Sequence, residues 1–207
     1  MIIFGATGTI GQHLVKQALE KHFKVTAFGR NKETLNNLLD KNLKFYQGDV
    51  LDQEAVKSAL TGQDIVFCTL GAGKKGGVRA TGTKHIIQGM EEIGIRRFIC
   101  QTTLGCGESV NNLNFIWKHI MFGWLLKDAY QDHQQQEKFV KSSNLNWTII
   151  RPAAFTDGPL TGTYKHSFSA DERNISLKIS RNDIAHFTLN QINSNADNFR
   201  KALAISY

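Results

Sequence analysis

The chain has 207 residues, 41% of them hydrophobic, and a net charge of +7, which suits one domain with a buried core. No apolar run reaches the length of a membrane span, and the first predicted strand begins at Met1 without a leader, so we expect a cytoplasmic protein without a membrane partner. The cations favour anionic ligands, but they are scattered and form no nucleic-acid-binding motif, so we expect no nucleic-acid partner. A monomer and a homodimer both stay open.

The first half of the chain alternates apolar runs with helical periodicity. Strands are predicted over residues 1–4, 24–28, 44–47, 64–69 and 97–102, and helices over residues 9–21, 32–39, 53–60 and 81–93. This alternation predicts right-handed βαβ units and a parallel sheet with helices on both faces.

The second half continues this pattern less regularly. It predicts a helix over residues 128–142, a strand over 147–150, hairpin-like segments at 162–169 and 175–179, a helix over 182–192 and a strand over 202–206. We expect an α/β protein with a Rossmann-type, doubly wound, mostly parallel sheet, as one domain over residues 1–207. Its substrate side would be built mainly from residues 103–127 and 151–180.

Glycines at positions 5, 8 and 11 join the first predicted strand to the first helix. Such glycines allow a tight turn, close approach of backbone N–H groups to a pyrophosphate, and close packing of helix on strand. This turn predicts dinucleotide contacts from Gly5, Thr7, Gly8, Thr9, Ile10 and Gly11.

The residue that ends the second strand indicates which nicotinamide cofactor binds. Arg30 follows Gly29, and no acidic residue occurs before Glu33. An arginine there suits the 2′-phosphate of NADP, whereas a carboxylate suits the ribose hydroxyls of NAD. We therefore predict NADP(H) in preference to NAD(H); the alternative is that Arg30 caps a surface turn.

The ends of the third and fourth strands complete the predicted cofactor site. Asp49 and Val50 follow the third strand, where the adenine would lie, although Asp49 can instead cap the helix that starts after Asp52. Leu70 and Gly71 end the fourth strand, beside the expected nicotinamide ribose.

Several motifs resemble those of one enzyme group: Gly-Ala-Thr-Gly-Thr-Ile-Gly (5–11), Gly-Arg (29–30), Gly-Asp-Val (48–50), Gln-Asp-His (131–133), Arg-Pro (151–152), Asp-Gly-Pro-Leu-Thr-Gly (157–162) and Ile-Ser-Arg-Asn-Asp-Ile-Ala (179–185). The chain resembles an atypical short-chain dehydrogenase/reductase of the NmrA-like kind, nearest to the biliverdin reductase B/flavin reductase group. The resemblance implies an NAD(P)-binding Rossmann fold, with cofactor contacts from Thr102, His133, Pro152 and Ala153 and substrate contacts from Ala154 and Phe155.

The chain departs from ordinary short-chain dehydrogenases at the Tyr-x-x-x-Lys pair, whose positions are occupied by Ala129 and His133. Without that tyrosine, we expect an acceptor that takes hydride and obtains its proton from water. The predicted function is an NADPH-dependent reductase of a planar conjugated acceptor: a flavin, a quinone or a tetrapyrrole. The alternative is a non-catalytic redox sensor, which NmrA-like proteins also include.

Two residues are the candidates for a catalytic role. Thr102 would hydrogen-bond the nicotinamide carboxamide or the acceptor, because no base beside it could activate a nucleophile. His133 would donate a proton or contact a ribose hydroxyl, and its alternative is an exposed helix histidine.

Three further features carry alternatives. The aromatic segment 113–126 predicts a helix packed on the sheet or on a second subunit, or a wall of Phe115, Trp117 and Trp124 for a planar substrate. The glycine-rich basic segment 71–84 is either a mobile solvated loop or a positive flap. Of the cysteines, Cys68 and Cys100 are expected in buried strands and Cys106 in an exposed loop, with no metal-ligand spacing.

Overall fold

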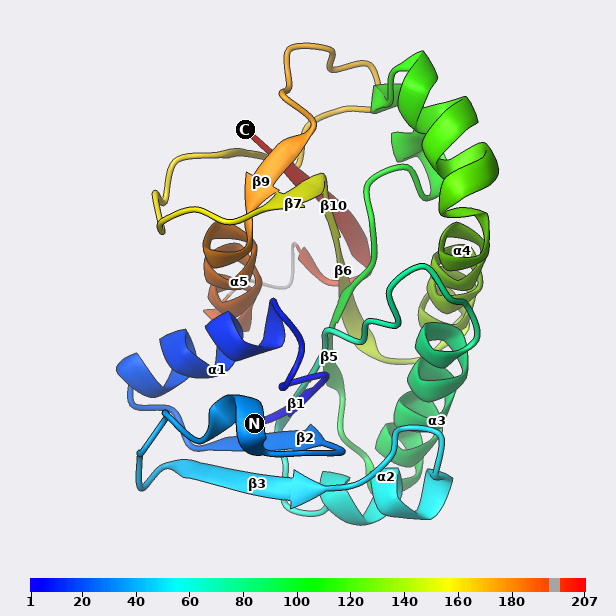
Figure 1. Cartoon of the computed structure of the whole chain (residues 1–207). Helices are drawn as coiled ribbons and strands as arrows, with labels where there is room; N and C mark the ends of the chain where they lie inside the picture. The colour runs from blue at the N-terminus through cyan, green and yellow to red at the C-terminus, as the bar shows by residue number, and fades with distance from the viewer. Residues whose placement is uncertain (194–197) are drawn as a thin grey trace.

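The computed structural model describes residues 1–193 and 198–207, which form one large sheet with helices on both faces (Figure 1). The strand order is β3-β2-β1-β4-β5-β6-β10-β8. All neighbouring strands are parallel except the β10–β8 pair. The strands of this sheet are β1 (Ile2–Phe4), β2 (Val25–Gly29), β3 (Leu43–Gln47), β4 (Ile65–Cys68), β5 (Arg97–Gln101), β6 (Asn146–Pro152), β8 (Lys165–His166) and β10 (Lys201–Ser206). The predicted Rossmann-type doubly wound sheet is confirmed.

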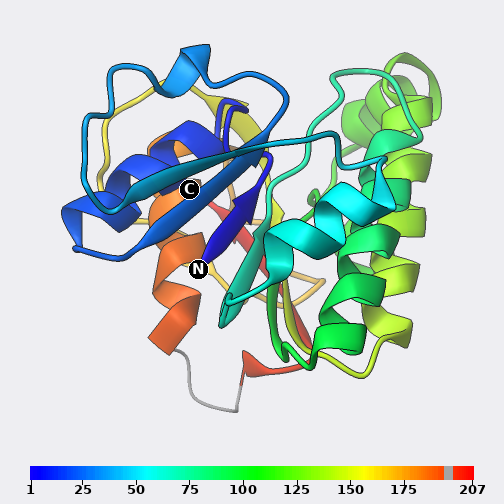
Figure 2. The same ribbon diagram turned by 90° about the horizontal axis from the view of Figure 1, so that it is seen from below.

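The helices are divided between the two faces of the sheet (Figures 1 and 2). α1 (Gly11–Glu20) packs beside α5 (Arg181–Asn190), whereas α2 (Gln53–Leu60), α3 (Val78–Ile93) and α4 (Lys127–Ser142) cover the opposite face. Each face has its own hydrophobic core, one including Leu14 and Ile184 and the other including Ile86 and Val140. Because the central strands are buried on both sides, they are continuous apolar runs.

Side-chain carboxylates set the starts of two helices. The Asp52 carboxylate accepts hydrogen bonds from the N–H groups of Glu54 and Ala55 at the start of α2. α3 begins at Val78, earlier than the sequence predicts, because Asp132 from α4 accepts from the backbone N–H groups of Arg79 and Ala80. This cap comes from a residue distant in sequence, so local patterns could not predict it.

Two predicted elements are wrong. The helix over 32–39 is only a 3-10 turn, Glu33–Leu35, since Leu35 is its one buried residue and Leu39 is 96% exposed, which leaves no apolar face to bury. The segments 162–169 and 175–179 do not pair as a hairpin. β8 pairs with β10, whereas β9 (Lys178–Ser180) pairs in parallel with β7 (Ala154–Thr156) in a separate sheet.

The aromatic segment forms a π-helix, Ile116–Leu125, in which no residue is fully buried. Trp117 and Phe122 pack partly against the core, but Phe115 and Trp124 are exposed. The expected helix forms, but it lies beyond the N-terminal end of α4 and reaches the core through Trp117 and Phe122 instead of lying flat on the sheet (Figure 1). Its packing on a second subunit stays a prediction.

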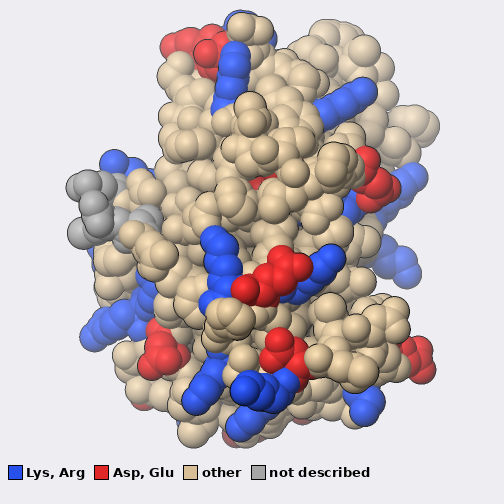
Figure 3. Space-filling view, turned by 90° about the vertical axis from the view of Figure 1, so that its left-hand side faces the viewer, with Lys and Arg blue, Asp and Glu red and all other residues tan. Residues whose placement is uncertain are grey.

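No helix among the described residues is long and apolar enough to cross a membrane. On the face of the molecule that carries α1, Lys and Arg side chains are interspersed with Asp and Glu, in keeping with the scattered cations of the sequence (Figure 3).

Candidate functional site

A cavity of about 680 Å³ lies at the carboxyl ends of β1 to β4, and we call it the cofactor cleft. This is where doubly wound sheets bind dinucleotides, at the point where strand order reverses between β1 and β4. The predicted cofactor residues in its lining are Gly5, Thr7, Gly8, Thr9, Ile10, Arg30, Asp49, Val50, Leu70, Gly71 and His133. Those that sequence reasoning missed include Phe28, Thr69, Lys75, Arg79 and Gln101.

The glycine turn has the shape that a dinucleotide requires. Gly5 has φ +81°, and a Cβ there would lie 2.6 Å from the Thr69 carbonyl oxygen. A Cβ on Gly11 would lie 2.1 Å from the Gly5 carbonyl oxygen, so the helix could not pack so closely on the strand. α1 starts without a side-chain cap or an acidic residue in its first turn. An uncapped helix N-terminus beside a glycine cradle fits a pyrophosphate.

The other end of the cleft holds Arg30 and Asp49. Arg30 directly follows β2 and is exposed, so its guanidinium is available to a ligand in the cleft. Asp49 does not cap α2, because Asp52 does; instead its Oδ1 accepts from the Leu51 N–H at 3.0 Å. The helix-capping alternative for Asp49 is therefore wrong.

A second cavity of about 300 Å³ lies next to the cleft, and we call it the acceptor cavity. Its walls are mostly apolar, with a few polar groups, as is usual for a small-molecule site. Its lining residues are Gly73, Arg79, Thr103, Leu104, Leu113, Trp117, Phe122, Leu126, Ala129, Tyr130, His133, Pro152, Ala153, Ala154, Phe155, Leu177 and Arg181. Arg79, His133 and Phe155 line both cavities, so the two spaces meet at these three side chains.

Three of the five predicted substrate residues line the acceptor cavity. Trp117, Ala154 and Phe155 line it, whereas Phe115 and Trp124 do not and are 70% and 78% exposed. Pro152 and Ala153, expected at the cofactor, line the acceptor cavity and not the cofactor cleft, where β6 ends at Pro152.

The surroundings of His133 determine its chemistry. The Gln136 amide nitrogen donates to Thr83 Oγ1 at 3.0 Å, so its oxygen faces His133 Nδ1, also at 3.0 Å. The Nδ1–H therefore donates, and Nε2 is left as an acceptor. Burial, with the charge of Arg79, lowers the pKa of His133 to about 4. A neutral, half-buried imidazole suits a contact with a ribose hydroxyl; it does not suit proton donation near neutral pH.

Thr102 lies outside both cavities. It is fully buried, and its hydroxyl donates to Glu137 Oε1 at 2.9 Å. The predicted contact of Thr102 with the nicotinamide carboxamide or the acceptor is therefore wrong. Because successive residues of an extended chain point to opposite sides, Thr102 faces α4 and the next residue, Thr103, lines the acceptor cavity.

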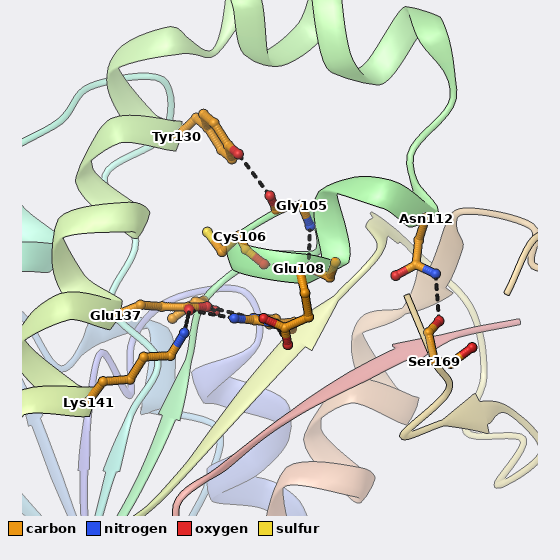
Figure 4. Close-up of polar contacts among 11 residues, drawn as sticks. Gly105, Cys106, Glu108, Asn112, Tyr130, Glu137, Lys141 and Ser169 are labelled. Carbon is orange, nitrogen blue, oxygen red and sulfur yellow. Dashed lines mark hydrogen bonds and ion pairs between the residues drawn. The ribbon is translucent and has the colours of Figure 1, made fainter. Parts of the chain in front are cut away.

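A buried ion-pair network holds the segment that follows β5 (Figure 4). Arg151, 1% exposed, donates from Nε and Nη2 to the two Glu137 oxygens at 2.8 and 2.7 Å, and from Nη1 to Glu108 at 2.5 Å. Lys141 Nζ lies 2.9 Å from Glu137. Burial alone would raise the pKa of Glu137, but the bonds and charges of Arg151 and Lys141 hold it below its usual range.

This network fixes the chain between β5 and the π-helix. Glu108 belongs to the 3-10 helix Gly107–Asn112, and Gly107 approaches Arg151 so closely that a Cβ would lie 2.7 Å from Nη2. The Tyr130 hydroxyl donates to the Gly105 carbonyl at 2.8 Å (Figure 4). α4 and β6 thus hold the segment that contributes Thr103 and Leu104 to the acceptor cavity.

The cysteines contribute no metal site. Cys68 and Cys100 are buried as predicted, but Cys106 is buried too, so its expected exposure is wrong. It lies close to the ion-pair network, and burial together with the charge of Glu137 raises the pKa of its thiol. Within the described residues, no group of His, Cys, Asp and Glu could hold a metal ion.

The basic segment 71–84 is anchored by Arg79. This side chain is 5% exposed and donates to the carbonyls of Gly73 and Lys75 at 2.8 and 2.9 Å, beside Asp132 at 3.4 Å. The segment is therefore tied to α4, and its arginine is not solvated. Lys75 lines the cofactor cleft, whereas Lys74 and Lys84 line neither cavity.

Comparison with solved structures gives close matches to the fold. ChuY from Escherichia coli O157:H7, described as an anaerobillin reductase, is similar with a TM-score of 0.83 and 24% identity, covering 99% of this chain and 95% of ChuY. A short-chain dehydrogenase/reductase from Veillonella parvula in complex with NADP is similar with a TM-score of 0.83 and 19% identity, covering 100% and 93% of the two chains.

Relatives found by sequence extend over most of the chain. YhfK from Bacillus subtilis, named an uncharacterised sugar epimerase, is 28% identical over 193 residues, covering 89% of this chain and 84% of YhfK. An uncharacterised chloroplastic protein from Arabidopsis thaliana is 25% identical over 177 residues, and the match spans 61% of its length. Residues 5–195 match the sequence model of a family described as NAD(P)H-binding. With the glycine cradle and the doubly wound sheet, this match shows that the chain belongs to the NAD(P)H-binding family.

Proposed function

We propose that this protein is an NADPH-dependent reductase that transfers hydride to a planar, conjugated acceptor. The observation that carries the proposal is the junction of the two cavities: a cleft with a glycine cradle and a more polar lining meets a mostly apolar cavity at Arg79, His133 and Phe155. A dinucleotide bound with its pyrophosphate at the cradle would extend its nicotinamide along β4 toward this junction.

When bound, NADPH would supply a hydride, that is one hydrogen nucleus with two electrons, and would be left as NADP⁺. The residues of the chain bind, orient and exclude water. His133 Nε2 accepts from a ribose hydroxyl, while Trp117 and Phe122 provide flat apolar walls for the acceptor. Because Thr102 is bonded to Glu137 and His133 is neutral, neither donates a proton. Flavins, quinones and tetrapyrroles suit this site, since each accepts hydride and then takes a proton from water.

The preference for NADPH is also a proposal, supported by Arg30. Its exposed guanidinium at the end of β2 suits charge-assisted, bidentate bonds to a 2′-phosphate. The neighbours agree with this chemistry: the Veillonella parvula protein was crystallised with NADP, and ChuY is described as a reductase. The apolar walls favour a planar acceptor over the sugar suggested by the name of YhfK.

The test is to mix purified protein with NADPH and a panel of flavins, quinones and biliverdin, and to follow the absorbance of the reduced nicotinamide. We expect oxidation that saturates with at least one acceptor and is lost in Gly8→Val, whose branched side chain would occupy the cradle. Tight NADPH binding without oxidation by any acceptor would contradict the proposal and favour the redox-sensor alternative.

A further inference from the structure

The acceptor cavity has an arginine at its mouth whose present partner is held weakly. Arg181 is the first residue of α5, and its Nη1 lies 2.7 Å from Oδ1 of Asp157. The Arg181 side chain is 22% exposed, but that of Asp157 is 95% exposed. An ion pair with so exposed a carboxylate contributes little to stability, and a ligand can displace it.

A second donor of Arg181, its Nε–H group, also favours a ligand here. Its Nε is buried and makes no hydrogen bond with any residue that the structure describes, so a desolvated N–H is left unsatisfied. A buried donor without a partner carries a free-energy cost that a suitable acceptor atom would remove. The guanidinium also lies 5.8 Å from the centre of the Phe155 ring, which restricts its orientation where the two cavities meet.

The charged residues that line the acceptor cavity also favour an anionic ligand. Among the described residues that line it, two are arginines, Arg79 and Arg181, and none is acidic. Arg79 Nε is likewise buried, with no hydrogen-bond partner among residues 1–193 and 198–207. Apolar walls with only positive charge at the edge suit a ligand that is largely flat and apolar but carries a negative group.

We infer that the acceptor carries an oxyanion, a carboxylate or a phosphate, which Arg181 binds through Nε and an Nη group in place of Asp157. This inference rests on the proposed function, because it names the class of acceptor for the same cavity. The fork of the guanidinium then fixes which end of the acceptor lies at the mouth, and so which ring atoms lie toward His133.

The test measures binding to the NADP⁺-saturated protein with matched pairs of acceptors. One arm compares flavin mononucleotide with riboflavin by quenching of flavin fluorescence, and the other compares anthraquinone-2-carboxylate with its carboxamide by quenching of tryptophan fluorescence. We expect the anionic member of at least one pair to bind roughly tenfold or more tightly, as a charge-assisted bond implies. Tighter binding of flavin mononucleotide would indicate a site for a phosphate, and tighter binding of the anthraquinone carboxylate would indicate a site for a carboxylate.

Variants connect this difference to Arg181. Arg181→Gln should abolish the preference for the anionic member and leave the dissociation constant of the neutral member unchanged. Asp157→Asn should strengthen anion binding by up to about fivefold, because the competing carboxylate is removed. Arg173→Gln is the matched control: it removes an exposed arginine that lines neither cavity and should leave both constants unchanged.

Turnover measured in parallel separates this inference from the proposed function. NADPH oxidation with equal affinity for both members of each pair would overturn the inference and leave the reductase proposal intact. Charge-dependent binding through Arg181 without oxidation would support the inference and count against the reductase. Failure of all four compounds to bind, or equal weakening of both members by Arg181→Gln, would overturn the inference.

Discussion

The cofactor cleft and the acceptor cavity are built in different ways, although they meet at three shared side chains. Most of the cleft is formed at strand ends in the first 80 residues, largely by backbone and by glycines whose missing Cβ atoms make room. The acceptor cavity is formed mostly by side chains from residues 73–181, which come from loops, the π-helix, α4 and the strands β6 and β7.

The support of the two regions differs accordingly. The cleft is supported by ladder hydrogen bonds of parallel strands and by a local turn, in which Gly8 N–H donates to Gly5 O at 2.9 Å. The acceptor cavity depends on a buried ion-pair network that joins β6, α4 and the segment after β5. Changes in one region should therefore affect one ligand and spare the other.

The largest effect is expected from the network. Arg151→Met removes a buried charge and leaves Glu137 with Lys141 and Thr102, so the free energy of unfolding should fall by about 3–5 kcal/mol. Lys141→Met, at a 40% exposed partner of the same carboxylate, should cost at most about 1 kcal/mol. Chemical denaturation measures the free energy of unfolding of both variants. Equal losses in the two variants would show that the stability of the network does not depend mainly on Arg151.

The next largest effect should fall on the cleft alone. Gly8→Val places a branched side chain where a Cβ would already lie 3.2 Å from the Gly5 carbonyl oxygen. We expect at least about a hundredfold weaker binding of either dinucleotide, near 2.7 kcal/mol, with little change in the unfolding transition. Calorimetric titration with NADPH and with NADH checks this, and retained affinity would mean that the pyrophosphate lies elsewhere.

A smaller effect should discriminate between cofactors. Arg30→Ala should weaken NADPH roughly tenfold, by loss of a charge-assisted bond, and leave NADH almost unchanged. Lys16→Ala, which removes an exposed cation on α1 that lines neither cavity, is the control. Equal losses for the two dinucleotides in Arg30→Ala would contradict the proposed 2′-phosphate contact.

The smallest effect is expected at the junction. Because the pKa of His133 is lowered to about 4, the imidazole is neutral from about pH 6 to 8. In His133→Gln, kcat should keep the pH profile of the original protein, while KM for NADPH rises a few fold, by loss of one hydrogen bond. A profile that bends near pH 6.5 only in the original protein would instead make His133 the proton donor.

The same shift predicts a change of stability with pH. Between about pH 6.5 and 4 the unfolded chain binds a proton at His133 that the folded chain does not, so the free energy of unfolding falls as pH falls through this range. His133→Gln should reduce that fall. Thermal unfolding at several pH values measures it, and identical slopes for the two proteins would show that His133 stays solvated.

Much of the cleft was predictable because its signals are local. The spacing of Gly5, Gly8 and Gly11, the strand before them and the helix after them are contiguous, and the backbone conformation they require follows from the absence of a Cβ. The alternation of strands and helices likewise predicted a mostly parallel, doubly wound sheet, since parallel strands need crossovers of one hand.

The sequence by itself therefore determined the doubly wound sheet, the glycine cradle and the position of Arg30 at a strand end. Only the tertiary structure decided that Thr102 bonds Glu137, that Cys106 is buried and that His133 is neutral. Those outcomes depend on partners distant in the chain, and burial and pKa follow from which groups pack around a side chain rather than from its neighbours in sequence.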